Sequence, residues 1–353
     1  MNRLEERGFR DRDFVSTEEG FLFCVVGPYH PADRVISYLK YLPDPAGKWR
    51  KGKDRFKRVM RTYTIPSLLE TFDLLRNAHP QYLFFSPIYN ITMTAVPREN
   101  IVNHFKPEKK LAKLFKKPRL DSLQKKVVRF VSLLSKFSAV SVSDFGITGS
   151  ILLNIHNPSF SDMDVTIYGA ENSYAVKRVL TELPLTSDFD VKRFNEAKLA
   201  KWVVQKTQNH PLNHTEAKRI YERKWNIGIF DHTLFSVHPV KLEKELTEKY
   251  GDKVYHPGRM VTVRTVVDDS GDSIFLPATY KVREVKIEEN IEANVEEVVT
   301  YEGLYDSLAE KGERIEVKGK LEHVVDKRTN EKYDRVLVGS PEGKGVEYMK
   351  LLD

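Results

Sequence analysis

The chain has 353 residues, a length that allows two or three domains with a hydrophobic core each. Its net charge is +7 and it has a single cysteine, which excludes an internal disulfide and favours the cytoplasm. Because it has neither an apolar run of about eighteen residues nor an apolar N-terminal stretch, we expect no membrane span and no secretory signal.

The first part of the chain, residues 1–118, is predicted to form an α+β domain. Residues 14–26 are predicted to be a buried strand, and the apolar spacing predicts helices over 33–39 and 65–78. Residues 47–52 carry glycines and basic side chains and are predicted to be a loop.

Residues 104–130 are strongly basic. This segment contains ten lysines and arginines and two acidic residues, a local net charge of +8. Its leucines, valines and phenylalanines recur at helical spacing, which predicts amphipathic helices with their apolar stripes turned inward. The charged faces could bind nucleic-acid phosphates, or they could be merely solvated.

Two short motifs follow, the pair Gly149-Ser150 and the pair Asp162-x-Asp164. On a β-strand, residues i and i+2 point to the same face, so the two carboxylates should project together while Met163 points into the core. Two adjacent carboxylates repel each other unless a cation neutralises them, and Mg²⁺, or Mn²⁺ in its place, prefers such oxygen ligands. We therefore expect a metal site on Asp162 and Asp164.

The Gly149-Ser150 pair precedes an apolar segment that is predicted to be helical. Glycine lets the backbone approach a phosphate closely, and free N–H groups at a helix start can face a triphosphate. Gly149 and Ser150, together with Ser161 just before the carboxylate pair, are therefore candidate nucleotide-binding residues.

With these motifs, the chain resembles the DNA polymerase β-like nucleotidyltransferase superfamily, whose signature is a Gly-Ser turn followed about ten residues later by an Asp-x-Asp strand. It is most similar to a branch of predicted archaeal nucleotidyltransferases labelled "DNA polymerase subunit beta". The similarity to this branch includes five further segments, at residues 12–15, 27–31, 222–224, 249–252 and 274–277.

The resemblance implies a third carboxylate on a later strand, where it shares a metal and helps to deprotonate the attacking hydroxyl. In this sequence the expected place holds Ser236 or His238. Asp231 lies several residues earlier and is the preferred candidate, and Asp188 and Asp190 are the alternatives. All three could equally be solvated turn or edge carboxylates.

The spacer between the two motifs lacks the basic residue that many members of the superfamily use to contact phosphates. Arg223 and Lys224, which belong to the similar segments, are therefore candidate phosphate ligands. Alternatively, they form the charged end of a surface helix. The nucleotidyltransferase domain is placed at residues 119–250, with helices predicted over 120–134, 172–183, 196–205 and 216–224 and strands over 225–240.

The last part, residues 251–353, alternates polar and apolar residues in long runs. The runs can be ordered as three strands, a short helix at 304–310 and two more strands, which is the order of an OB-like barrel. Tyr280, Tyr301 and Tyr305 could stack on bases. The acidic stretch 284–313 favours packing against the transferase domain or a protein instead.

The predicted fold is therefore α+β, with a nucleotidyltransferase core, an N-terminal α+β region and a C-terminal OB-like barrel. The predicted activity is metal-dependent transfer of an NMP from an NTP to a hydroxyl, with a nucleic acid as the favoured acceptor and RNA slightly preferred over DNA. The alternative is a nucleotidyltransferase fold with little or no turnover that binds nucleic acid or a protein. The sequence does not indicate an oligomeric state.

Overall fold

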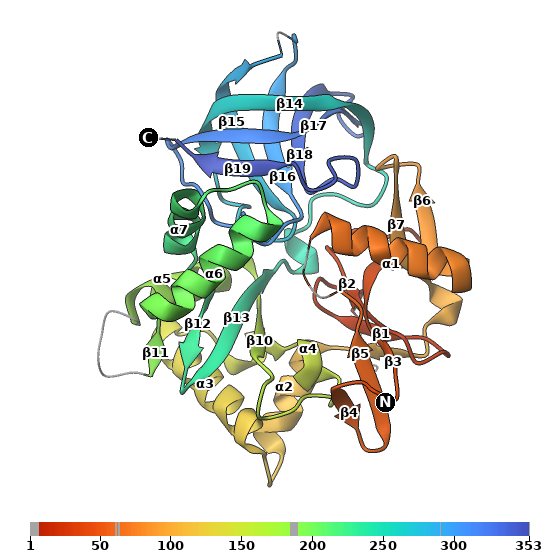
Figure 1. The fold of residues 1–353 in the computed structure, drawn as a ribbon, viewed down its shortest axis with the longest axis vertical. Helices are drawn as coiled ribbons and strands as arrows, with labels where there is room; N and C mark the ends of the chain where they lie inside the picture. The colour runs from red at the N-terminus through yellow and green to blue at the C-terminus, as the bar shows by residue number, and fades with distance from the viewer. Residues whose placement is uncertain (1–6, 61, 63, 184–189, 290, 353) are drawn as a thin grey trace.

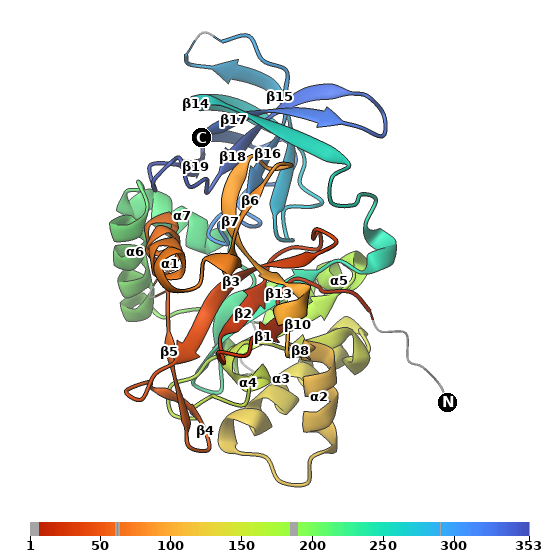
Figure 2. The same cartoon turned by 90° about the vertical axis from the view of Figure 1, so that its right-hand side faces the viewer.

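Alternating and helical apolar patterns give this chain three sheets and a set of covering helices (Figures 1 and 2). The computed structural model describes residues 7–60, 62, 64–183, 190–289 and 291–352. Its sheets follow one another along the chain, within residues 14–105, 145–240 and 253–351. The α+β class predicted from the sequence is confirmed, and the domain boundaries near residues 118 and 250 remain predictions.

The first sheet is antiparallel throughout, with the order β4-β5-β3-β2-β1-β8, and β7 and β6 extend it from β3. One helix, α1 (Ile65–Ala78), packs on it through the buried Leu75. The strands are β1 (Phe14–Ser16), β2 (Leu22–Val25), β3 (Arg34–Pro43), β4 (Trp49–Lys51), β5 (Asp54–Arg58), β6 (Leu83–Ser86), β7 (Ile91–Pro97) and β8 (Asn103–Phe105).

Three predictions for this region need correction. The helix expected over 33–39 is strand β3, because Val35, Leu39 and Tyr41 are inserted into the sheet core by pairing with β2, β5 and β7. The expected strand 14–26 is divided into β1 and β2 by a turn that contains Gly20 at φ 77°. The basic loop 47–52 supplies β4 and the turn of a β4–β5 hairpin.

The second sheet has the order β11-β12-β13-β10-β9, in which β10 and β13 run parallel and the other neighbours are antiparallel. Its strands are β9 (Phe145–Ile147), β10 (Met163–Tyr168), β11 (Val191–Lys192), β12 (Ile227–Phe230) and β13 (Thr233–Val240). The accompanying helices are α2 (Pro107–Lys116), α3 (Ser122–Ser138), α4 (Gly149–Leu152), α5 (Ala170–Glu182), α6 (Glu196–Asn209) and α7 (His214–Arg223). All four helices predicted for this region are present, with bounds shifted by a few residues.

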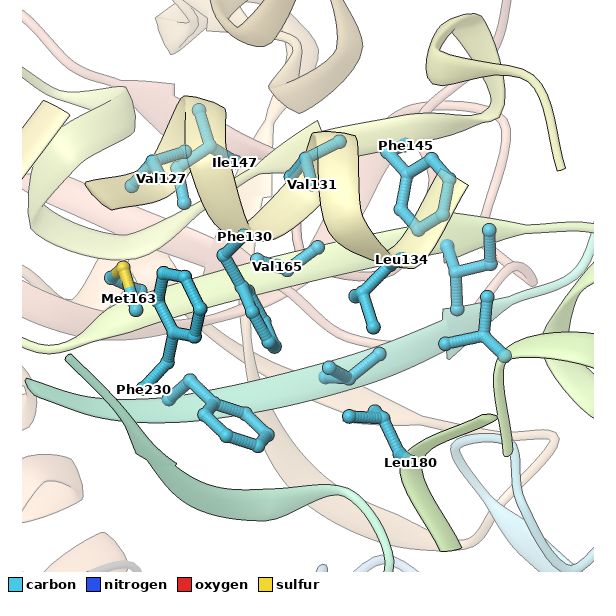
Figure 3. Close-up of a cluster of buried hydrophobic side chains, with 14 of the residues drawn as sticks. Val127, Phe130, Val131, Leu134, Phe145, Ile147, Met163, Val165, Leu180 and Phe230 are labelled. Atoms are coloured by element: carbon cyan, nitrogen blue, oxygen red, sulfur yellow. The ribbon is translucent and has the colours of Figure 1, made fainter. Parts of the chain in front are cut away.

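Helices α3 and α5 cover one face of this sheet. Asp121 caps α3 by accepting a 2.9 Å hydrogen bond from the backbone N–H of Gln124. The buried stripe of α3 then meets β10, and Figure 3 shows Phe130 beside Val165 and Met163. The alternate residues of β10 therefore face away from these helices, toward the first sheet.

The third sheet closes into a barrel. Its order is β14-β15-β16-β18-β17, and β14 pairs with β17 to complete the ring, while β19 adds to the edge of β17. The strands are β14 (Lys253–Asp269), β15 (Ala278–Ile287), β16 (Val295–Thr300), β17 (Arg314–Asp326), β18 (Lys332–Val338) and β19 (Tyr348–Leu351). The predicted five-stranded barrel is confirmed, and it is closed by the pairing of β14 with β17.

Two details of the barrel differ from prediction. Residues 304–310 form turns, not a helix, because the nearby core holds this segment: Trp225 Nε1 donates to Ser307 Oγ at 3.0 Å. Tyr280 and Tyr305 are fully buried inside the barrel, so they cannot stack on bases.

The three parts pack on one another. Thr148 of the second part donates to the carbonyl of Arg12 in the first at 2.6 Å. Tyr89 of the first part stacks on Tyr255 of the barrel with ring centroids 5.3 Å apart. These contacts enclose a space between the parts, which the next section describes.

Candidate active site

Asp162 and Asp164 lie at the start of β10 and line one cavity. Met163 and Val165 are completely buried against α3 and α5, so the alternation predicted for this strand is present. Asp164 points to the opposite face, and Asp162 precedes the strand with its side chain exposed in the cavity wall.

The Gly149-Ser150 turn lies directly against Asp164. Gly149 has φ +65°, and a Cβ atom at this position would be 2.3 Å from Asp164 Oδ2. The backbone N–H of Thr148 donates to the carbonyl of Asp164 at 2.8 Å. Only glycine therefore lets this turn approach the carboxylate so closely.

Ser150 and Ser161 are both buried and support the loop between the two motifs. The carbonyl of Ser150 accepts a 3.0 Å hydrogen bond from the N–H of Ile155, and Ser161 Oγ accepts one of 3.0 Å from the N–H of Asn157. Within the described residues, the two serines therefore support the loop that connects the Gly149 turn to Asp162.

Ser236 occupies the position where a third carboxylate was expected. It is the register partner of Asp164 across the parallel pair β10–β13, and its Oγ donates to Asp164 Oδ1 at 2.6 Å. His238 Nε2 lies 2.9 Å from Ser236 Oγ and 3.9 Å from Asp164 Oδ1. The third position therefore holds a hydroxyl and an imidazole.

The structure does not bring Asp231 to this pair. Asp231 lies in the β12–β13 turn at φ 47°, and its carboxylate accepts a 2.9 Å hydrogen bond from Arg129. It precedes Ser236 by five residues, or roughly 16 Å along an extended strand. The tight turn starts β13 only at Thr233, so the structure places the preferred candidate away from Asp162 and Asp164.

The other two alternatives do not supply the third carboxylate either. Asp190 lies beside β11, at the far edge of the sheet, with Oδ1 3.5 Å from Lys192 Nζ. Asp188 is outside the described residues. In the part of the chain that the structure describes, no three His, Cys, Asp or Glu side chains form a metal-binding group.

The two carboxylates influence each other strongly. The charge of Asp164, together with partial desolvation in the cavity, raises the pKa of Asp162 to about 6. Burial raises the pKa of Asp164, but the nearby His238, the charge of Lys40 and the hydrogen bond from Ser236 outweigh burial and leave this pKa well below its usual range. The pair therefore concentrates negative charge that a cation would relieve.

These residues fit one hard cation. Two carboxylates are the protein share of a typical Mg²⁺ site, because Mg²⁺ keeps waters and takes further oxygens from substrate phosphates. A second ion bridged by three carboxylates does not fit, since Ser236 replaces the third.

A cavity of about 650 Å³ contains the pair and is lined by all three parts of the structure. The first part contributes Lys40 from β3 and Arg58 from the end of β5, whose positive charges act on Asp162. Sequence reasoning missed both cations, because β3 was predicted to be a helix and no local motif marks a lone lysine or arginine.

Arg223 and Lys224 are engaged with the barrel. Arg223 forms a 2.6 Å ion pair with Glu313 on the surface. Lys224 is buried in the cavity wall, where its Nζ donates to the carbonyl of Gly303 at 2.6 Å and to Asp306 Oδ1 at 2.7 Å. Both side chains thus bridge the core and the barrel, and only Lys224 lines the cavity.

The basic segment 104–130 forms α2, the following loop and most of α3. The exposed cations of this segment are Lys109, Lys113, Lys116, Lys117, Arg119, Lys125 and Arg129. Burial and the charges of Lys117 and Lys113 lower the pKa of Lys110 to about 8, and Lys51 of β4 adds to this effect. The β4–β5 hairpin therefore lies near α2.

This hairpin enlarges the basic surface. Its exposed cations are Lys48, Arg50, Lys51, Lys53, Arg55 and Lys57. The N–H of Arg50 donates to the carbonyl of Ile155 at 3.1 Å, which fixes the hairpin beside α4 (Figure 2). Strand β5 then leads to Arg58 in the cavity, so the basic surface continues to the carboxylates.

One relative provides the comparison with known proteins. The chain is 27% identical over 354 residues to "Uncharacterized protein MJ1086" of Methanocaldococcus jannaschii, with 97% of this chain and 98% of the relative covered. No family model matches the sequence, and no solved structure matches it. None of the described helices is long and apolar enough to cross a membrane.

Proposed function

We propose that this chain is a metal-dependent nucleotidyltransferase of the DNA polymerase β-like superfamily, which transfers an NMP from an NTP to a hydroxyl and releases pyrophosphate. The observation that carries the proposal is the contact between the Gly149 turn and Asp164, with Asp162 beside them in one cavity. This is the juxtaposition of glycine turn and paired carboxylates that the motif spacing predicts.

Each residue has a defined task in this proposal. Asp162 and Asp164 would hold Mg²⁺ or Mn²⁺, and the bound ion supplies stabilisation of negative charge on the triphosphate. Ser236 orients Asp164 by donating a hydrogen bond to it, and His238 holds Ser236 through a second hydrogen bond. Lys40 and Arg58 add positive charge on the side of the first sheet.

The proposed acceptor is a hydroxyl of a nucleic acid, with RNA slightly favoured. The cations of α2, α3 and the β4–β5 hairpin form a basic surface, and strand β5 connects this surface to the cavity. A polyanion bound there would release counterions, so its affinity should fall steeply with salt.

A second candidate function is supported by Ser236. Because a hydroxyl stands where a third carboxylate would share a metal, the chain could bind a nucleotide and a nucleic acid or protein with little turnover. The two functions differ in pyrophosphate release and not in nucleotide binding.

The test is incubation with labelled NTPs, Mg²⁺ or Mn²⁺, and a panel of tRNA, single-stranded RNA and DNA. We expect label transfer by the wild type and by Asp190→Asn, a matched control at the far edge of the sheet. The double variant Asp162→Asn with Asp164→Asn should transfer none, and labelling that persists in it would contradict the proposal. Nucleotide binding without any transfer in the wild type would favour the second candidate.

A further inference from the structure

A second polar region of the cavity lies apart from the two carboxylates. It is formed by α6, the start of β12 and a loop of the barrel. Trp202 and Lys206 of α6 line it, and Asn226 lines it from the residue before β12. The function proposed above uses none of these side chains.

Asn226 carries an unmet hydrogen-bonding requirement. Its side chain is 6% exposed, and its Nδ2 is directed to Asp306, at 3.3 and 3.4 Å from the two carboxylate oxygens. Its Oδ1 is buried and has no hydrogen-bond partner among the described residues. A buried acceptor without a partner is costly, so a ligand that donates here would remove that cost.

Trp202 offers an aromatic surface in the same region. Its side chain is half-buried and lines the cavity. The Tyr221 ring meets the edge of the indole, with the two ring centroids 5.5 Å apart. Lys206 Nζ lies 5.4 Å from the centroid of the Trp202 ring. Indole rings are effective platforms for stacking nucleobases.

The separation from the carboxylates suits one nucleotide. Asp164 pairs with Ser236, and Ser236 pairs with Ile227, the neighbour of Asn226. Two strand spacings place Asn226 roughly 10 Å from Asp164. A nucleotide whose phosphates lie at the carboxylates could therefore place the far edge of its base at Asn226.

We propose that Trp202 and Asn226 form the nucleobase subsite of the cavity, and that it selects a base with an exocyclic amino group. This inference rests on the proposed function, because the triphosphate is placed at Asp162 and Asp164. Cytosine N4 and adenine N6 donate to an acceptor such as Asn226 Oδ1, whereas O4 of uracil at the matching position is itself an acceptor.

The experiment compares the affinities of CTP, UTP and inorganic tripolyphosphate, each with Mg²⁺, by calorimetric titration of the full chain. We expect CTP to bind about fivefold more tightly than UTP, the factor that one net hydrogen bond provides. Asn226→Leu should abolish this difference and leave tripolyphosphate binding unchanged. Trp202→Leu should weaken both nucleotides by about tenfold or more through the loss of stacking, again with no change for tripolyphosphate.

Trp49→Leu is the matched control, because Trp49 lies on the β4–β5 hairpin, is not part of the cavity lining and should leave all three affinities unchanged. Equal binding of CTP and UTP by the wild type would overturn the inference, as would an equal effect of Asn226→Leu on all three ligands. If tripolyphosphate binds but nucleotides bind no more tightly, only the base subsite fails. If tripolyphosphate does not bind, the proposed triphosphate site itself fails.

Discussion

Ser236 Oγ donates a 2.6 Å hydrogen bond to Asp164 Oδ1 across two parallel neighbouring strands. The two side chains lie in register on the same face of the sheet, so position 236 is where a further metal ligand would reach the ion held by Asp164. This relationship defines how the site differs from a three-carboxylate site, and it suggests a direct way to change it.

Ser236→Asp should make the protein depend more strongly on Mg²⁺. Without the metal, a third carboxylate beside Asp164 replaces a hydrogen bond by repulsion, which should lower the free energy of unfolding by about 2 kcal/mol. With Mg²⁺, the added ligand should offset that loss and raise the rate of label transfer. Thermal unfolding in EDTA and in Mg²⁺ measures the effect.

The control for this substitution is Ser236→Ala, which loses the hydrogen bond but gains no ligand. It should destabilise the protein by about 1 kcal/mol without a larger response to Mg²⁺. If both variants respond equally to Mg²⁺, position 236 does not face the metal.

Gly149→Ala should be far more damaging than Gly52→Ala, although both glycines have positive φ, +65° and +60°. Gly52 has no atom within 4 Å of an added Cβ, so alanine there should cost only the backbone strain of about 1 kcal/mol. At Gly149 the Cβ would also collide with Asp164, which adds about 2 kcal/mol and displaces a metal ligand. Denaturant unfolding and Mg²⁺ titration of the two variants test this, and equal losses of stability would contradict it.

Local patterns predicted the helix over 65–78, the four helices of residues 119–250 and the carboxylate strand correctly. Helix α3 has an apolar stripe and a capping pair within four residues, and at the start of β10 the buried Met163 and Val165 flank Asp164, which lines the cavity. Such signals depend on neighbours in the sequence, so they can be read without the fold.

The errors arose where distant pairing decides the outcome. Residues 33–39 fit a helix locally, but three partner strands make them part of β3, which also brings Lys40 to the site. The sequence indicates Ser236 or His238 at the third ligand position, but the distance of Asp231 from that position depends on the tight turn before Thr233, where Asp231 and His232 both have positive φ. The part that Lys224 plays depends on Asp306, 82 residues away.

Lys224→Met should disrupt the contact between the second part of the structure and the barrel. Lys224 Nζ is buried and donates to Asp306 and to the carbonyl of Gly303. Its removal leaves the Asp306 carboxylate without its main partner, which should lower the free energy of unfolding by about 3–5 kcal/mol. Its neighbour supplies the control: Arg223→Met removes an exposed pair with Glu313 and should cost less than about 1 kcal/mol. Similar losses in the two variants would show that Lys224 does not hold the barrel in place.

Nucleic-acid binding should depend on α2 and on the β4–β5 hairpin together. Replacing Lys113, Lys116 and Lys117 by glutamate should weaken RNA binding and reduce the salt dependence of the binding constant, by about 0.7 in logarithmic slope for each RNA phosphate that is no longer neutralised. Replacing Lys51, Lys53 and Arg55 should do the same.

The control for the salt series is a triple glutamate variant of exposed cations on other elements, Arg178, Lys192 and Lys201. It changes the net charge equally but should leave the slope of the binding constant against salt unchanged. Filter-binding measurements between low and physiological salt provide the comparison, and an equal effect of all three variants would show that only net charge matters.

His30 should make the protein sensitive to acid. Burial, followed by the charge of Arg98, lowers the pKa of His30 to about 4, and its Nδ1 accepts a 3.2 Å hydrogen bond from the N–H of Ile36. In the unfolded chain, the imidazole of His30 takes up a proton below about pH 6.5. The neutral His30 ring therefore contributes fully to the free energy of unfolding above that pH, and this contribution is lost as the pH falls toward 4.

Between pH 7 and pH 4.5 the wild type should therefore lose about 2 kcal/mol more of its unfolding free energy than His30→Gln. His214→Gln, at an exposed position, should retain the wild-type pH dependence. Urea unfolding at a series of pH values gives these curves. Parallel curves for the wild type and His30→Gln would mean that His30 is protonated in the folded state without cost, and that its bond to Ile36 does not require the neutral ring.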